Sequence, residues 1–348
     1  MDITSLKKNN LFVGRAATAI YLILKNSIQE KEVILPSNIC YAAVYPIIYS
    51  NNKPVFVDID TNTGNAVFEE ILKKINKNTG AIIFPYMYGN ISTDIIKLKD
   101  YCNKNNIILI EDCASAMGAK INGCDVGTFG DYSVFSTGHA KIVDVGNGGI
   151  LVTDKNIDKI EQDYKELGKY NNDIDNKLTE FSKQYRKLRN ENNNLKLQEF
   201  FSQNYKEMFI YKLDEQYINK IKNELEKLND IIIERKENFE LFKNNLDETN
   251  SYKLLKFAKG SVPWRLTLII ENKDDRKNLI KILLDKKLFV SDWYPCIAKS
   301  FSSNETFPNS EYMEERILNF SLTDSKENIL QICETINEYF RGKNKWKK

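Results

Sequence analysis

Short apolar runs alternate with amphipathic stretches over the first 154 residues of the chain. Four runs have the length and composition of buried strands, namely residues 32–36, 54–59, 81–86 and 107–112. Helix-like segments lie between some of them, at residues 16–26 and 68–76. Strands that are apolar on both faces and separated by helices favour a mostly parallel sheet with right-handed crossovers. Two further strands, 131–136 and 148–154, are predicted on either side of a glycine-containing turn.

The pattern changes between residues 155 and 215, where Lys, Asn, Glu and Asp dominate and apolar residues occur only at intervals. Recurring Leu, Tyr and Phe favour exposed helices in this segment, and a disordered linker is the alternative. Residues 216–246 are predicted to form one long amphipathic helix, because apolar residues recur there at helical spacing: Ile218, Ile221, Leu225 and Leu228.

A second α/β portion follows, and its predicted elements are a strand at 264–271, a helix at 274–286, a strand at 288–293 and a last helix at about 326–340. We therefore expect two domains. The large domain covers residues 1–230 and includes the atypical charged helical segment 155–215. The small C-terminal domain covers residues 231–348.

The bulk composition excludes several classes of protein. The 348 residues carry 50 Lys and Arg against 48 Asp and Glu, so no basic field for nucleic acid is expected. Apolar runs are shorter than the roughly 18 residues of a membrane span, and the start of the chain lacks a signal-peptide core. We expect a cytoplasmic protein. Six scattered cysteines and a single histidine predict no metal site.

Two residues with catalytic potential follow predicted strands. Asp112 ends the run 107–112, and ligands bind at the carboxyl ends of parallel strands. The alternative is a solvated aspartate that begins a loop. Lys141 follows Phe135–Ala140 and precedes the glycine-rich residues 142–149, a setting that favours an amine able to form an imine. A solvated surface lysine is the alternative.

The first predicted helix begins with Gly14-Arg15-Ala16-Ala17, where small residues would let an anion approach the helix N-terminus. Arg15 either binds a carboxylate or phosphate or faces solvent. Together with Ser136, these residues supply the parts that pyridoxal phosphate requires: an amine for its aldehyde, a carboxylate for its ring nitrogen and a turn for its phosphate.

The order of these motifs resembles the DegT/DnrJ/EryC1/StrS family of pyridoxal-phosphate-dependent aminotransferases. The resemblance is strong over residues 10–154, is most specific from Glu111 to Gly149, and returns weakly near 225–300. It implies the fold type I architecture: an α/β fold with a mostly parallel central sheet, helices on both faces and a smaller C-terminal α/β domain. It also implies pyridoxal phosphate as cofactor and a homodimer with shared active sites.

The resemblance assigns roles at matched positions. Lys141 resembles the lysine that forms the imine with the cofactor, and Asp112 resembles the aspartate that pairs with the pyridine nitrogen. The other matched positions surround the cofactor: Gly14 and Arg15 in the phosphate-binding turn, Ser136 at the phosphate, and Ser115 where the family commonly has Gln near the phenolic oxygen.

Three departures from the family pattern concern the pocket. The stacking aromatic falls at Cys40, so either the adjacent Tyr41 supplies the ring face or the stacking is weaker. Gly146–Gly149 keeps the glycine turn but has Asn147 in place of an acid. A segment usually reading Asn-Tyr-Arg-Met, which reaches the partner subunit's site, has no clear counterpart. We therefore expect a substrate pocket unlike that of ordinary members.

Four residues are candidates for substrate contact, and each has a packing alternative. His139 is the only histidine and lies two residues before Lys141. Tyr88 and Tyr294 are aromatics at predicted strand ends. Arg265, or Arg15 in its place, is expected to hold a substrate carboxylate or phosphate.

The resemblance implies transfer of an amino group from an amino acid, usually glutamate, to a nucleotide-linked keto-sugar in surface-glycan or secondary-metabolite synthesis. A small phosphorylated ketone is the alternative acceptor. One rival class is a cofactor-free nucleotide-sugar binding protein or glycosyltransferase, which leaves Asp112, Ser136 and Lys141 unexplained. A degenerate scaffold is another, and the retained lysine and aspartate speak against it. Family dehydratases carry His in place of the lysine, so Lys141 favours transamination.

Overall fold

A seven-stranded sheet forms the centre of the computed structural model, which describes residues 2–191, 193–301 and 305–345. The strand order is β1-β9-β8-β5-β4-β2-β3. Strands β3, β2, β4, β5 and β8 run parallel, and β9 and β1 each pair antiparallel with their neighbours. The strands are β1 Asn9–Val13, β2 Glu32–Pro36, β3 Lys53–Val57, β4 Thr79–Pro85, β5 Ile108–Asp112, β8 Tyr132–Ser136 and β9 Gly149–Thr153. The mostly parallel sheet predicted from the sequence is confirmed.

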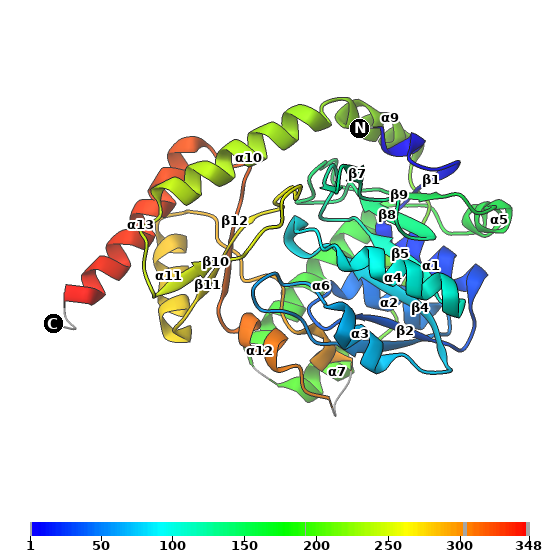
Figure 1. Cartoon of the computed structure of the whole chain (residues 1–348), viewed down its shortest axis with the longest axis horizontal. Coiled ribbons are helices and arrows are strands. Elements are labelled where there is room, and N and C mark those ends of the chain that lie inside the picture. The colour runs from blue at the N-terminus through cyan, green and yellow to red at the C-terminus, as the bar shows by residue number, and fades with distance from the viewer. Residues whose placement is uncertain (1, 192, 302–304, 346–348) are drawn as a thin grey trace.

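Two apolar cores cover the two faces of this sheet, because successive strand residues point to opposite sides. Val33 and Leu35 of β2 lie in the first core, against α1 and α2, whereas Ile34 lies in the second core, against α3 and α4. These helices are α1 Ala16–Ser27, α2 Tyr41–Tyr49, α3 Phe68–Lys74 and α4 Asp94–Asn105. Helices therefore lie on both faces of the sheet, as the predicted fold class requires (Figure 1).

The charged segment after β9 is helical, as predicted, but it is less exposed than expected. Its helices are α5 Asp158–Lys165, α6 Asn172–Asn190, α7 Asn194–Phe201 and α8 Lys206–Phe209. Four of its aromatic residues are buried against Tyr41 and Tyr45 of α2. We call the resulting group the aromatic cluster, and its members are Tyr41, Tyr45, Phe181, Tyr185, Phe200, Phe201, Tyr205, Phe209 and Trp293. Packing within this cluster holds the charged segment against the first core.

The single helix predicted for residues 216–246 is two helices, α9 Glu215–Glu226 and α10 Leu228–Asn245. The break falls at Lys227, which has φ −88° and ψ 0°. Ile221 of α9 and Leu228 belong to the second core, and Phe242 of α10 belongs to a third core. The change of direction at Lys227 thus lets the chain leave one core for another, which α10 does along one side of the molecule (Figure 1). The predicted domain boundary at residue 230 lies in the first turn of α10, and the division into domains stays a prediction.

The third core lies beside a second, antiparallel sheet in the order β10-β11-β12, with α11 and α13 against it. These elements are β10 Tyr252–Leu254, β11 Leu266–Ile270, α11 Lys273–Asp285, β12 Ile317–Phe320 and α13 Lys326–Lys345. They lie at the opposite end of the molecule from α5 (Figure 1). Between α11 and β12 the chain forms η3 Ile297–Ser300 and α12 Pro308–Glu314.

The predicted strand at 288–293 is wrong. Only Ser291 forms a bridge there, with Asn319 of β12. Leu288 packs in the third core, but Asp292 turns towards Arg189 and Arg276, and Trp293 enters the aromatic cluster. Apolar composition predicted the strand, whereas the partners of its last residues lie outside the small sheet.

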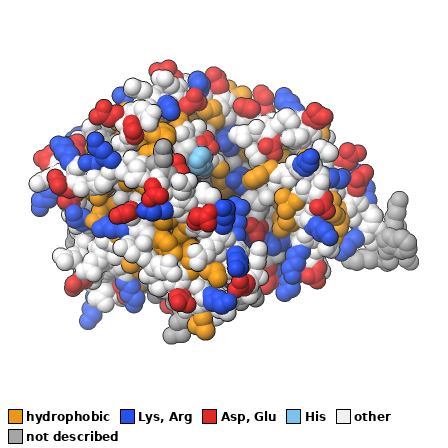
Figure 2. Space-filling model, turned by 180° about the vertical axis from the view of Figure 1, so that it is seen from behind, with side chains coloured by type: hydrophobic (Ala, Val, Ile, Leu, Met, Phe, Trp, Pro, Cys, Tyr) orange, Lys and Arg blue, Asp and Glu red, His pale blue; other side chains and the backbone are white. Residues whose placement is uncertain are grey.

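Surface charge matches the near-zero net charge of the sequence, because Lys and Arg side chains are interspersed with Asp and Glu over the face shown in Figure 2. Among the helices of the described residues, none is long and apolar enough to cross a membrane.

Glu111 in β5 is the most heavily bonded buried charge near the centre of the large sheet. Its side chain has no exposed surface. It accepts five hydrogen bonds of 2.7–3.2 Å, from Tyr86, Gly127, Phe129, Gly130 and Ser133. Three of these donors are backbone N–H groups of the loop that precedes β8. Glu111 therefore attaches this loop to the strand that ends at Asp112.

We expect Glu111→Gln to lower the free energy of unfolding by about 3 kcal/mol, because an amide offers one acceptor oxygen and turns an N–H₂ towards backbone donors. Urea unfolding monitored by circular dichroism measures the change. Glu69→Gln is the matched control, since that side chain is 66% exposed. Equal stabilities of the two variants would contradict the role given to Glu111.

Candidate active site

The predicted cofactor residues lie together at the carboxyl ends of the central strands β5 and β8, which we call the carboxyl edge of the sheet. Asp112 ends β5 and pairs in register with Val134 of β8. Ser136 ends β8 and lies opposite Gly149, which in turn lies opposite Val13 at the end of β1. The turn at Gly14 therefore lies close to Ser136, and both lie at the same sheet edge as Asp112.

Asp112 is a buried carboxylate, with 8% of its surface exposed. Burial raises its pKa above the usual value for an aspartate, and a hydrogen bond from the Ala114 N–H (2.9 Å) and the charge of Lys141 offset part of that increase. A cation opposite this carboxylate would lower its electrostatic cost further.

Lys141 directs its amine towards Ser115. The Nζ atom lies 3.3 Å from the Ser115 Oγ, which lies 3.5 Å from the Tyr294 hydroxyl. The same Nζ is 5.9 Å from the centre of the Trp264 ring. The amine therefore lies among side chains from both the large sheet and the C-terminal portion, within the influence of Asp112.

The start of α1 has the features of an anion site. Arg15, the N-cap residue, is extended and makes no side-chain hydrogen bond to the first turn in the described structure. Side chains therefore leave first-turn N–H groups uncapped. A Cβ on Gly14 would come within 2.3 Å of the Tyr211 carbonyl oxygen, so only glycine fits this close approach. The Tyr211 hydroxyl bonds to Asn147 (2.7 Å).

Cys40 and Tyr41 point to different surroundings. Burial raises the pKa of the Cys40 thiol, and the nearby charges of Lys141 and Asp112 also act on it. The ring of Tyr41 lies in the aromatic cluster, 5.1 Å from Phe181 and 5.7 Å from Trp293. Of the two residues considered for the cofactor face, Cys40 is therefore the one on which the charge of the Lys141 amine acts.

The candidate substrate residues differ in their exposure and in their distance from the Lys141 site. The His139 side chain is 87% exposed, 3.9 Å from Asp144, and is visible on the surface (Figure 2). Tyr88 is fully buried, with its ring 5.6 Å from that of Tyr294. Arg265 lies over the Trp264 ring at 4.2 Å. Tyr294 thus adjoins Ser115 at the Lys141 site, Arg265 lies against the same Trp264 ring as the Lys141 amine, and Tyr88 packs on Tyr294.

Three residues at the site were missed in the sequence. The Trp264 indole N–H donates to the Ala140 carbonyl. Arg235 donates to the carbonyls of Trp264 (2.9 Å) and Lys141 (3.3 Å). Tyr211 packs on the Gly14 turn. Arg235 had a detectable signal, because it occupies the apolar face of its helix, seven residues from both Leu228 and Phe242.

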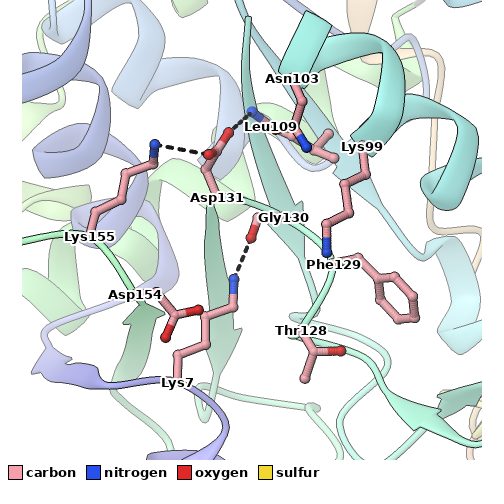
Figure 3. Close-up of a pocket in the computed structure, with 10 residues that line it drawn as sticks. All are labelled: Lys7, Lys99, Asn103, Leu109, Thr128, Phe129, Gly130, Asp131, Asp154 and Lys155. Atoms are coloured by element: carbon pink, nitrogen blue, oxygen red, sulfur yellow. Dashed lines mark hydrogen bonds and ion pairs between the residues drawn. The ribbon is translucent and has the colours of Figure 1, made fainter. Parts of the chain in front are cut away.

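A different pocket of about 290 Å³ lies at the amino ends of β5 and β8, away from Asp112 and Ser136 (Figure 3). Asp131 in this pocket contacts Lys155 (2.9 Å) and accepts from the Leu109 N–H (3.0 Å). Lys7 donates to the Gly130 carbonyl. None of the residues predicted to bind the cofactor lines this pocket.

The Lys141 site fits pyridoxal phosphate. Asp112 is a buried carboxylate suited to a protonated ring nitrogen, and the Lys141 amine is close to it. Ser136 and the uncapped start of α1 supply groups for a phosphate at the same edge. Ser115 lies beside the amine, and the charge of the amine acts on the Cys40 thiol.

Comparison with known proteins gives concordant matches. The model of the DegT/DnrJ/EryC1/StrS aminotransferase family matches residues 6–337. The chain is 36% identical to GDP-perosamine synthase of Vibrio cholerae over 152 residues, which cover 43% of this chain and only 41% of that protein. It is 27% identical to GDP-perosamine synthase of Escherichia coli O157:H7 over 95% of this chain and 85% of that protein.

The fold also matches solved structures. The crystal structure of the aminotransferase TlmJ from Streptoalloteichus hindustanus aligns with a TM-score of 0.78 at 18% identity, over 99% of this chain and 90% of that one. At this identity the likeness concerns the fold alone, and it agrees with the fold type I architecture expected from the sequence.

The raised pKa of Asp112 predicts that Asp112→Asn stabilises the cofactor-free protein at neutral pH. A folded-state pKa above the unfolded value of 3.8 means that ionisation costs stability as the pH rises through the folded pKa. We expect the melting temperature at pH 8 to rise by roughly 1–3 °C, with a smaller difference at pH 4. Asp230→Asn on the exposed side of α10 is the control. A lower melting temperature for Asp112→Asn at pH 8 would refute this reading of the burial.

Proposed function

Because the chain belongs to the DegT/DnrJ/EryC1/StrS aminotransferase family, we propose that it is an aminotransferase with Lys141 and Asp112 as its catalytic residues. The cofactor is pyridoxal phosphate. The observation that carries this proposal is the position of the Lys141 amine at the carboxyl ends of the parallel strands, 3.3 Å from the Ser115 hydroxyl, where its charge acts on the buried carboxylate of Asp112.

Bound pyridoxal phosphate supplies an aldehyde for amino groups and a ring that withdraws electrons. Asp112 holds a proton on the ring nitrogen, and in doing so gains a cationic partner for its own buried charge. The amine of Lys141 would form the imine with that aldehyde and, when free, would accept and return the proton of the substrate carbon. Ser136 and the start of α1 hold the phosphate, and Gly14 keeps that turn open to it.

The donor is an amino acid, with glutamate as the expected one, and the acceptor is a keto group. Relatives named GDP-perosamine synthase support a nucleotide-linked keto-sugar as acceptor, for surface-glycan or secondary-metabolite synthesis. The two substrates use one site in turn, so the pocket around Tyr294 and Arg265 must accept both.

We also propose a cytoplasmic homodimer whose active sites are shared between subunits, as the family resemblance implies. Sedimentation velocity of the purified protein at micromolar concentration measures its mass and so tests the dimer.

We expect the purified protein with pyridoxal phosphate to show a visible absorption band that glutamate removes. Lys141→Ala should lack the normal band and lose amino transfer by at least about a thousandfold, because the imine-forming amine and the proton carrier are both gone. Lys120→Ala, which changes an exposed hairpin lysine, is the matched control and should behave as wild type. A normal band and normal transfer in Lys141→Ala would exclude Lys141 as the catalytic lysine.

A further inference from the structure

Two arginines near Lys141, the buried Arg235 and the half-buried Arg265, have no acidic partner within 4.0 Å in the described part of the chain. Arg235 is 5% exposed and donates only to backbone carbonyls, and its Nε is buried without a hydrogen-bond partner. The Nη1 of Arg265 is likewise buried without a partner. Across residues 2–191, 193–301 and 305–345, no carboxylate lies within 4.0 Å of either guanidinium.

Two other arginines with little exposed surface, Arg189 and Arg276, are paired with carboxylates. Arg189 lies 3.1 Å from Asp292 and 3.5 Å from Glu314. Arg276 lies 3.1 Å from the same Asp292. Buried guanidinium groups are normally compensated in this way, because an unpaired one keeps the full cost of desolvation.

Burial and mutual repulsion both act against the charges of these two guanidinium groups. Burial, together with the charge of Arg265, lowers the pKa of Arg235 to about 10, and burial also lowers the pKa of Arg265. Both groups nevertheless stay cationic at neutral pH. An anion that binds here would remove a like-charge repulsion and satisfy free N–H groups in one step.

Arg265 and the Lys141 amine both lie close to the ring of Trp264. Its guanidinium lies 4.2 Å from the centre of the Trp264 ring, the same ring that lies 5.9 Å from the Lys141 amine. Tyr294, whose hydroxyl adjoins Ser115, is also close enough to act on the charge of Arg265. Arg15 lies at the start of α1, 6.0 Å from the Phe209 ring, on the side where the phosphate of the cofactor is expected, and its charge acts on the Cys40 thiol.

We propose that Arg265, supported by the charge of Arg235, is an anion subsite that binds the carboxylate or phosphate of a substrate next to Lys141. The proposal rests on the aminotransferase function proposed above. The phosphate of the cofactor has its own groups at Ser136 and the start of α1, which leaves Arg265 for the substrate. A guanidinium fork binds two oxygens of one carboxylate or phosphate, and so fixes the orientation of the substrate as well as its position.

Calorimetric titration of 2-oxoglutarate and of inorganic phosphate into the cofactor-loaded protein tests the subsite. We expect one of these anions to bind wild type and to bind Arg265→Met at least 20-fold more weakly, with an intermediate loss in Arg265→Lys. Dependence of 2-oxoglutarate binding on Arg265 identifies a carboxylate of the donor, and dependence of phosphate binding identifies a phosphorylated acceptor.

Arg316→Met is the matched control, because Arg316 also lies 4.2 Å above an aromatic ring, that of Tyr312, but is paired with Glu315. It should change neither affinity by more than twofold. The melting temperature of Arg265→Met should not fall, since a half-buried guanidinium with an unpaired Nη1 has been removed; a purely structural arginine would give a clear fall. Anion affinities that agree within twofold between wild type and Arg265→Met, or no binding to wild type, would overturn the proposal.

The loss of the visible band on addition of glutamate, measured in the same variants, separates this proposal from the proposed function. Equal glutamate dependence in wild type and Arg265→Met, together with unchanged anion binding, leaves the aminotransferase intact and removes the subsite. Anion binding through Arg265 with a band that glutamate never changes leaves the subsite intact and removes the glutamate-dependent reaction.

Discussion

The buried carboxylate of Glu111 is the interaction on which the geometry of the site depends. Of its five hydrogen bonds, three attach the loop before β8 to the end of β5 and one comes from Ser133 in β8 itself, so the two strands that carry Asp112 and Ser136 are held in register. Because side chains alternate along a strand, Glu111 faces the second core and the adjacent Asp112 faces the other side. Glu111, which stabilises the fold, and Asp112, which is expected to act in the reaction, are therefore adjacent in sequence but lie on opposite faces of the sheet.

The parts of this arrangement that follow from local sequence were predictable. The apolar runs of β2, β4 and β5 are long enough to identify as strands, and Asp112, Ser136 and Lys141 stand at or just after strand ends, where a parallel sheet gathers its functional groups. The helical character of the charged segment also followed from its recurring apolar residues. Each of these inferences needs only residues within a few positions of one another.

Features that depend on distant partners were not predictable in the same way. The ring of Tyr41 enters the aromatic cluster because α6 and α7, more than a hundred residues later, supply its neighbours. The segment 288–293 leaves the small sheet because Asp292 finds Arg189 and Arg276. Trp264 and Arg235 reach Lys141 across a sequence separation of more than ninety residues. No local pattern encodes such contacts, although an arginine on the apolar face of a helix marks a site that deserves a structural explanation.

Arg235 connects the large-sheet portion of the chain to the C-terminal portion through hydrogen bonds. It belongs to α10, which leads from the second core to the third, and it bonds to the carbonyl of Lys141 on one side and that of Trp264 on the other. The position of Arg265 relative to the Lys141 amine is therefore set by one short connection, since Arg265 directly follows Trp264. A substrate anchored at Arg265 would inherit that fixed distance from the amine. Under the proposed function, the rigid sheet edge supplies the chemistry, the C-terminal portion supplies recognition, and the buried guanidinium between them keeps the two in alignment.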